Sequence, residues 1–264
     1  MPTVCRPTSW PPPAESSPRV PECGHDRRSH GARHLLPHGG DNISEQFLHD
    51  LDPAEFTTRI VDYPAEYGSP GTYADSRAAG REALLGAIGA SPNPVVLGGY
   101  SQGAQIAGDV AAEISAGQHP ELDVRGVALI ADPSRPRGRC VGIDPGGWGI
   151  SGERDTGLPT WWVAAAGDPI TSLPAGNPLR SLADMTEFYS LSSPEAATRW
   201  AQHMIDTATN RSMQPWWNLD RWQDWGGALA WMKGYLTDGR HTTAYLAEGH
   251  CKALAGALNQ ELPR

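Results

Sequence analysis

From about residue 43 onward, the chain alternates between short apolar runs bounded by turn-forming residues and longer stretches with apolar residues at helical spacing. The apolar runs predict strands over residues 57–63, 94–100, 124–131 and 160–166. The helical spacing predicts helices over residues 44–52, 73–88, 103–115 and 242–258. Strands that alternate with helices are typical of a parallel sheet covered by helices, so we expect an α/β fold.

Two segments depart from this alternation. Residues 9–42 are rich in Pro, His and Arg, which indicates an irregular N-terminal segment. Between residues 175 and 238 the strand pattern disappears, and helix-like stretches over 194–209 and 216–236 predict a helical insertion or cap. We expect both segments to belong to a single domain spanning residues 1–264, because this length suits one sheet domain with an insertion.

The formal net charge of −9 argues against nucleic acid as a partner, because nucleic-acid binding relies on clustered Lys and Arg. No apolar run approaches the roughly 18 residues that a transmembrane helix needs. The first residues show neither the charged lead nor the apolar core of a signal peptide. We therefore expect a soluble protein made in the cytoplasm, which would act at a cell envelope only after release by another agent.

The cysteines and histidines give no pattern typical of a metal site. The four cysteines (Cys5, Cys23, Cys140 and Cys251) lie far apart without a CxxC pair, so reduced thiols are expected and a Cys5–Cys23 bond stays open. His30, His34 and His38 recur every four residues, but Pro and Gly surround them, which favours a solvated tract over a metal site. We expect no metal and no cofactor.

Residues 99–103 read Gly-Tyr-Ser-Gln-Gly and match the G-x-S-x-G pattern of a nucleophile elbow. A serine hydroxyl is a poor nucleophile, so it needs exposure on a tight turn, a base and donors for the oxyanion. An apolar strand runs into this motif and an Ala-rich helix follows it, which is the context the elbow requires. Ser101 is therefore the candidate nucleophile; the alternative is a Gly-rich turn in a non-hydrolytic domain.

The order Ser, acid, His in hydrolases of this kind restricts the candidates for the base. His119 precedes both candidate acids, and His203 resembles an ordinary helix residue of the insertion. His241 follows Asp-Gly-Arg on a loop before the last helix, so we favour it as the base, with His250 as the runner-up. His241 can reach the sheet edge from such a loop.

Two Asp residues end strands after the nucleophile strand, and each precedes a proline. The orienting acid must accept the imidazole N–H from a rigid position. We favour Asp168 over Asp132 because the later strand usually supplies the acid. For both, the alternative is the common role of Asp in initiating a turn.

The oxyanion hole should take the backbone N–H of Gln102 and a second donor from the loop after the first strand. With the first strand at the start of the chain, this loop lies around Thr8. Pro7 has no N–H to donate, so Thr8 is the candidate second donor.

Several of these segments together resemble a known family. They are residues 98–104 (Gly-Gly-Tyr-Ser-Gln-Gly-Ala), 167–170 (Gly-Asp-Pro-Ile), 238–245 (Asp-Gly-Arg-His-Thr-Thr-Ala-Tyr) and the Trp-rich helical stretch. Over residues 56–258 the chain resembles the lysin B esterases of mycobacteriophages, cutinase-like α/β-hydrolases. The resemblance implies a Ser101–Asp168–His241 triad that cleaves the ester between mycolic acids and arabinogalactan during phage-induced host lysis. Residues 6–8, Arg-Pro-Thr, depart from the Arg-Gly-Thr of that family.

Five tryptophans fall within sixteen residues of the insertion: Trp216, Trp217, Trp222, Trp225 and Trp231. A lipid-contacting or glycan-contacting cap is one interpretation, and a small aromatic core is the favoured one. For the whole chain we carry three hypotheses: a mycolyl-arabinogalactan esterase, a general cutinase-like esterase or lipase, and a noncatalytic cell-wall or virion protein on a hydrolase scaffold.

Overall fold

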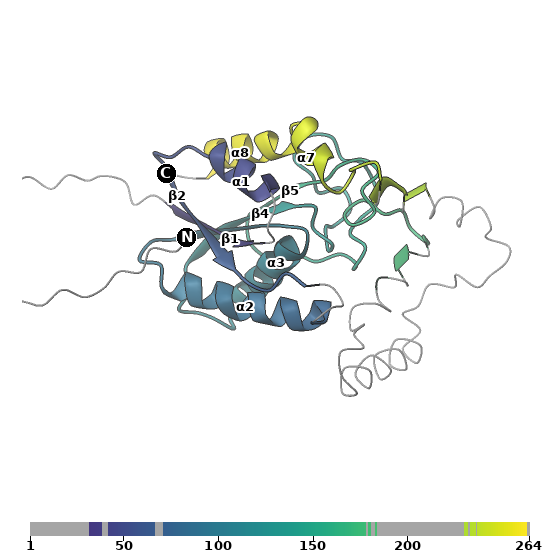
Figure 1. Ribbon diagram of the computed structural model, residues 1–264. Helices are drawn as coiled ribbons and strands as arrows, with labels where there is room; N and C mark the ends of the chain where they lie inside the picture. Colours follow the sequence, from purple (N-terminus) through teal and green to yellow (C-terminus); the bar gives the residue numbers. More distant parts are fainter. Residues whose placement is uncertain are drawn as a thin grey trace, which may run out of the picture.

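The computed structural model describes residues 32–38 as backbone and, in full, residues 42–66, 71–177, 179–180, 183, 230–231, 233–235 and 237–262. Five parallel strands form one sheet in the order β2-β1-β3-β4-β5 (Figure 1). The strands are β1 (Ala32–His38), β2 (Phe56–Asp62), β3 (Val95–Tyr100), β4 (Val124–Ile130) and β5 (Thr160–Val163). The expected parallel sheet is confirmed.

Helices cover both faces of this sheet (Figure 1). On one face lie α1 (Asn42–His49), α7 (Thr243–Ala247) and α8 (His250–Glu261). On the other lie α2 (Tyr73–Gly89) and α3 (Gln102–Ser115). The connection from β1 to β2 runs toward one edge of the sheet, and the connections from β2 to β3 and from β3 to β4 run toward the other edge. Because each crossover is right-handed, α1 covers the face opposite to α2 and α3.

Successive side chains of a strand point into two apolar clusters, one on each face of the sheet. Because both faces are buried, the strand sequences are nearly continuous apolar runs. In β3, Val96 packs toward α1 and α8, whereas Val95 and Leu97 pack toward α2 and α3. In β4, Ile130 packs toward α1 and α8, whereas Leu129 packs toward α2 and α3. Both faces of the central strands are buried, so the position of the strand ends is strongly constrained.

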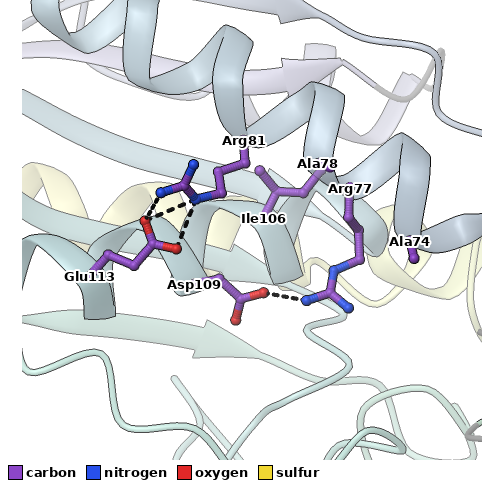
Figure 2. A pocket seen from close by; sticks show the side chains of 7 residues that line it. All are labelled: Ala74, Arg77, Ala78, Arg81, Ile106, Asp109 and Glu113. Atoms are coloured by element: carbon purple, nitrogen blue, oxygen red, sulfur yellow. Dashed lines mark hydrogen bonds and ion pairs between the residues drawn. The ribbon is translucent and has the colours of Figure 1, made fainter. Parts of the chain in front are cut away.

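Ion pairs join the two helices on the second face (Figure 2). Arg77 of α2 donates to Asp109 of α3 at 2.8 Å, and Arg81 donates to Glu113 at 2.7 Å. A cavity of about 480 Å³ lies between these helices, lined by Ala74, Arg77, Ala78, Arg81, Ile106, Asp109 and Glu113. Ser101, Asp168 and His241 do not line it.

The structure corrects the expectation for residues 9–42. Residues 32–38 form β1, an interior strand of the sheet, paired in parallel with β2 on one side and β3 on the other. The sequence did not predict this strand because its His and Arg residues interrupt the apolar run by which a buried strand is normally recognised. The expected irregular segment is therefore wrong over residues 32–38, while residues 9–31 and 39–41 lie outside the described residues.

The predicted single last helix is also wrong, because the chain forms two helices there. Gly249 separates α7 from α8 and has a left-handed backbone conformation with φ 76°. A glycine adopts this conformation without steric cost, so the helical spacing continues in the sequence although the helix itself breaks. His250 therefore begins α8 instead of lying inside a helix.

Most of the expected cap, residues 175–238, lies outside the described residues, including His203 and four of its five clustered tryptophans. Trp231 is described and packs with Leu173 and Leu179 in a small apolar cluster. Cys140 and Cys251 are free thiols, whereas Cys5 and Cys23 lie outside the described residues. None of the helices in the described part of the chain has the length and apolarity needed to cross a bilayer.

Candidate active site

Ser101 directly follows β3, and β3 lies next to the point at which the order of the strands in the sheet reverses. From β1 the chain moves to β2 at one edge and then returns past β1 to β3. Ligands in open parallel sheets bind at the carboxyl ends of strands near such a switch point. The topology therefore places Ser101 at a position suited to binding a substrate.

The backbone at Ser101 has the strained conformation of a sharp strand-to-helix turn, with φ 54° and ψ −118°. The Ser101 N–H donates to the Ile130 carbonyl at 2.9 Å, so the end of β4 holds the turn in place. Gly99 is required here because a Cβ at this position would collide with the carbonyl of Gly103. Gly99 thus lets β3 and α3 approach closely, and the serine lies at the turn between them.

His241 lies beside Ser101, with its Nε2 atom 2.8 Å from Ser101 Oγ. The residue is 6% exposed, and its imidazole stacks on the Tyr100 ring, with ring centroids 5.3 Å apart. The Tyr100 hydroxyl also donates a hydrogen bond to the His241 backbone carbonyl. Tyr100 therefore holds both the ring and the backbone of His241.

The other described histidine candidates have different partners. His250 contacts Glu248 at 3.2 Å, and His119 contacts Glu113 at 3.3 Å. Neither of these imidazoles is among the contacts of Ser101, so the structure brings His241 to the serine and leaves these two elsewhere.

Asp168 is fully buried behind His241, with its two carboxylate oxygens 3.1 and 3.0 Å from Nδ1 of the imidazole. The Ile170 N–H donates to Oδ1 of Asp168 at 2.9 Å. This bond is the Asp-initiated turn that was considered as the alternative role. In this structure the same side chain forms the turn and contacts the histidine.

Asp132, the other acid considered, is bound to different partners. Its Oδ2 atom accepts hydrogen bonds from Arg154 at 2.7 Å and from the Trp162 indole at 3.0 Å. Burial raises the pKa of this carboxyl group, and the Arg154 charge opposes that rise. Asp132 thus ties the loop that carries Arg154 to the end of β4.

Sequence reasoning assigned no role to Tyr245, which contacts Asp168 directly. Its hydroxyl donates to Oδ2 of Asp168 at 2.6 Å and accepts the Ala165 N–H at 3.2 Å. Tyr245 follows His241 by four residues, within the 238–245 segment that carries the family resemblance. That short spacing from the candidate base was the signal available in the sequence.

Gln102 is the first residue of α3, where backbone N–H groups have no acceptor within the helix. Its side chain closes a ring of hydrogen bonds: Gln102 Nε2 donates to the Glu66 carbonyl at 3.1 Å, and Ser76 Oγ donates to Gln102 Oε1 at 3.0 Å. The Glu66 N–H in turn donates to Ser76 Oγ at 2.9 Å. This ring holds the start of α3, and with it the Gln102 amide, against α2.

The expected second oxyanion donor, Thr8, lies outside the described residues. Thr8 therefore stays a prediction, and the first strand within the described part of the chain, β1, ends at His38.

Comparison with known proteins agrees with this architecture. Residues 20–263 match the model of the alpha/beta hydrolase family. A curated relative, the carboxylesterase Culp6 homolog of Corynebacterium glutamicum, is 46% identical over 82 residues. The match covers 28% of this chain and 26% of the relative, so the chain spans about a quarter of that protein's length.

Two solved structures are similar at low identity. An acetylxylan esterase is 16% identical, with 68% of this chain and 97% of that chain covered and a TM-score of 0.38. A cutinase-like protein from Cryptococcus sp. is 21% identical, with 53% of this chain and 77% of that chain covered and a TM-score of 0.34. The family match spans most of the chain and agrees with the expected fold class: this chain belongs to the alpha/beta hydrolase family.

Proposed function

We propose that this chain is a serine esterase in which Ser101, His241 and Asp168 form the catalytic triad. The observation that carries the proposal is the unbroken series of contacts from Ser101 Oγ to His241 Nε2 at 2.8 Å and from His241 Nδ1 to Asp168 at 3.0 Å. The relative's name, a carboxylesterase, supports ester bonds as the target. A noncatalytic scaffold would have no need of this arrangement.

In the first half of the reaction, Ser101 Oγ attacks the acyl carbonyl while its proton moves to His241 Nε2. The carbonyl oxygen becomes an oxyanion, which accepts a hydrogen bond from the Gln102 N–H at the start of α3. Asp168 holds the imidazole by Nδ1 and stabilises the imidazolium. The intermediate then collapses, the ester C–O bond breaks, and the alcohol leaves with the proton from Nε2.

In the second half, water attacks the acyl-enzyme while His241 Nε2 takes its proton. The bond to Ser101 Oγ breaks, the serine regains the proton, and the carboxylic acid departs. For the second oxyanion donor, Thr8 stays the candidate, and the residues that follow β1, which ends at His38, are a further one, because the donor is expected after the first strand.

For the substrate, we propose the ester that joins mycolic acids to arabinogalactan, and with it a part in phage-induced lysis. The support is the resemblance to lysin B esterases at residues 98–104, 167–170 and 238–245, which contain Ser101, Asp168 and His241. The second candidate is a general cutinase-like esterase acting on other acyl esters. It shares every chemical step and differs only in what the site accepts.

Two assays test these proposals in sequence. We expect the protein to hydrolyse p-nitrophenyl butyrate and Ser101→Ala to lose this activity while remaining folded by circular dichroism. Full activity in Ser101→Ala would refute the triad, and an inactive but folded wild type would favour the noncatalytic hypothesis. Release of free mycolic acids from purified mycobacterial cell walls would support the proposed substrate, whereas cleavage of short esters alone would favour the general esterase.

A further inference from the structure

Tyr245 occupies a position from which it can control the candidate catalytic acid. Its side chain is fully buried, and its hydroxyl lies 2.6 Å from Oδ2 of Asp168. The same hydroxyl accepts the backbone N–H of Ala165 at 3.2 Å. Because the Ala165 N–H can only donate, it occupies a lone pair of the hydroxyl and leaves the phenolic proton directed at Asp168.

The carboxylate of Asp168 is held by donors from two different segments. The Ile170 N–H, in the turn after Asp168, binds Oδ1 at 2.9 Å, and Tyr245, in α7, binds Oδ2. With both oxygens fixed, the carboxylate plane faces His241 Nδ1. Without the Tyr245 hydroxyl, Ile170 would hold one oxygen and the carboxylate could rotate about its χ2 torsion.

We propose, building on the triad assigned above, that Tyr245 is a positioning residue that orients Asp168 and limits how strongly this carboxylate attracts the proton of His241. A hydrogen bond donated to a carboxylate stabilises its charged form and takes up part of its negative charge. Burial next to the Asp168 charge raises the pKa of Tyr245 well above that of free tyrosine, so the phenol keeps its proton throughout the working range.

Among the residues that the structure describes, few other titratable groups surround this pair. Besides His241, the described groups that face Asp168 and Tyr245 are Tyr100, whose ring meets that of Tyr245 edge-on, His250, whose ring centroid lies 5.5 Å from that of Tyr245, and Arg240, which is paired with Glu248. The His241 ring itself also faces Tyr235, at a centroid distance of 5.2 Å. None of them changes in the variants below, so any shift in titration reports on the Tyr245 hydroxyl.

The first test is Tyr245→Phe, assayed with p-nitrophenyl butyrate between pH 5 and 9. We expect kcat to fall by roughly tenfold with little change in KM, because a hydrogen bond to a charged group is lost. The freed carboxylate attracts the imidazolium proton more strongly, so the midpoint of the acidic limb of kcat/KM should move upward. A purely structural role would lower the folded fraction and leave this midpoint unmoved.

A second variant keeps the hydroxyl and makes it a stronger donor: Tyr245 replaced by 3-fluorotyrosine. The midpoint should then move downward, opposite to Tyr245→Phe, because more carboxylate charge is taken up. The matched control is Tyr73→Phe, which deletes a tyrosine hydroxyl that donates to Gln105 Oε1 at the same 2.6 Å distance. We expect this control to leave the midpoint unchanged.

An NMR titration of the His241 ring in the whole protein separates this inference from the proposed function. If ester hydrolysis fails in the wild type, the triad proposal falls, but the ring's titration midpoint still reports on Tyr245. Opposite shifts in the phenylalanine and fluorotyrosine variants would support the positioning role. Shifts absent from both folded variants, or equal to that of Tyr73→Phe, would overturn it.

Discussion

Arg154 places a guanidinium nitrogen 2.7 Å from Oδ2 of Asp132, and it reaches this buried carboxylate across Gly108 of α3. The same guanidinium donates to Asp109 of α3 at 2.8 Å and to the Gln105 carbonyl at 3.2 Å. One arginine therefore joins the helix that begins at the candidate oxyanion donor to the end of the neighbouring strand. This role separates Asp132 from Asp168, which otherwise look alike in sequence.

The two acids give a matched pair of variants. We expect Asp168→Asn to lower kcat roughly a thousandfold or more, by analogy with loss of the triad acid in serine proteases, with the fold retained. Asp132→Asn should instead lower the free energy of unfolding by about 3 kcal/mol, because it takes the charge from a buried ion pair. Kinetics of p-nitrophenyl butyrate hydrolysis and urea unfolding distinguish them. Equal losses of activity per folded molecule would contradict the assignment.

Gly108 should be intolerant of any side chain, because a Cβ there would collide with the Arg154 guanidinium. We expect Gly108→Ala to lower the free energy of unfolding by about 1–3 kcal/mol, the usual cost of overpacking. The control is Gly86→Ala in α2, where a Cβ would meet no atom within 4 Å. That variant should be stabilised by roughly 0.5–1 kcal/mol, as helix propensity predicts. Similar changes in both variants, measured by urea unfolding, would argue against the crowding.

The pair of Arg81 and Glu113 predicts a pH dependence of stability. The hydrogen bond from Arg81 is the main cause that lowers the pKa of Glu113 from its usual 4.5. A lowered carboxyl pKa stabilises the fold above the unfolded-state value, and this contribution is lost as the pH falls through the lowered folded-state value. Arg81→Met should therefore lower the free energy of unfolding at pH 7 by only about 0.5–1 kcal/mol, because solvent partly screens the pair.

The effect of Arg81→Met should shrink as the pH falls below about 4.5, since the carboxylate then becomes protonated in the unfolded chain and next in the folded one. Unfolding curves at several pH values between 3 and 7 would show this. Arg125→Met removes a pair on the surface, between Arg125 and Asp123, and should leave stability unchanged. A constant difference between wild type and Arg81→Met across this pH range would contradict the prediction.

Arg135 is a buried cation that stabilises the loop between β4 and β5. It is fully buried and donates to Asp144 and to the backbone carbonyls of Pro136, Arg139, Gly146, Gly147 and Thr171. Arg135→Met should lower the free energy of unfolding by roughly 3–5 kcal/mol, because these acceptors lose their donor. The exposed Arg139 supplies the control, and Arg139→Met should have little effect in the same urea titration.

The sequence by itself determined those elements whose pattern of residue types lies within the element. Apolar runs and helical spacing predicted β2, β3 and β4 and the helices α2 and α3 to within a residue or two, because burial on both faces shows in the residue types themselves. The glycines around Ser101 predicted a tight turn in the same way, since only a small residue permits the close approach of strand and helix. The order of Ser101, Asp168 and His241 along the chain likewise predicted them as candidate site residues.

The tertiary structure decided what depends on residues distant in the chain. Pairing with β2 and β3 makes residues 32–38 an interior strand of the sheet although their own composition does not predict a strand. Asp132 and Asp168 both end a strand before a proline, and only their neighbours, Arg154 for one and His241 and Tyr245 for the other, distinguish them. Hydrogen bonds between side chains 70 or more residues apart leave no local pattern, because the fold alone brings those atoms within 3 Å of each other.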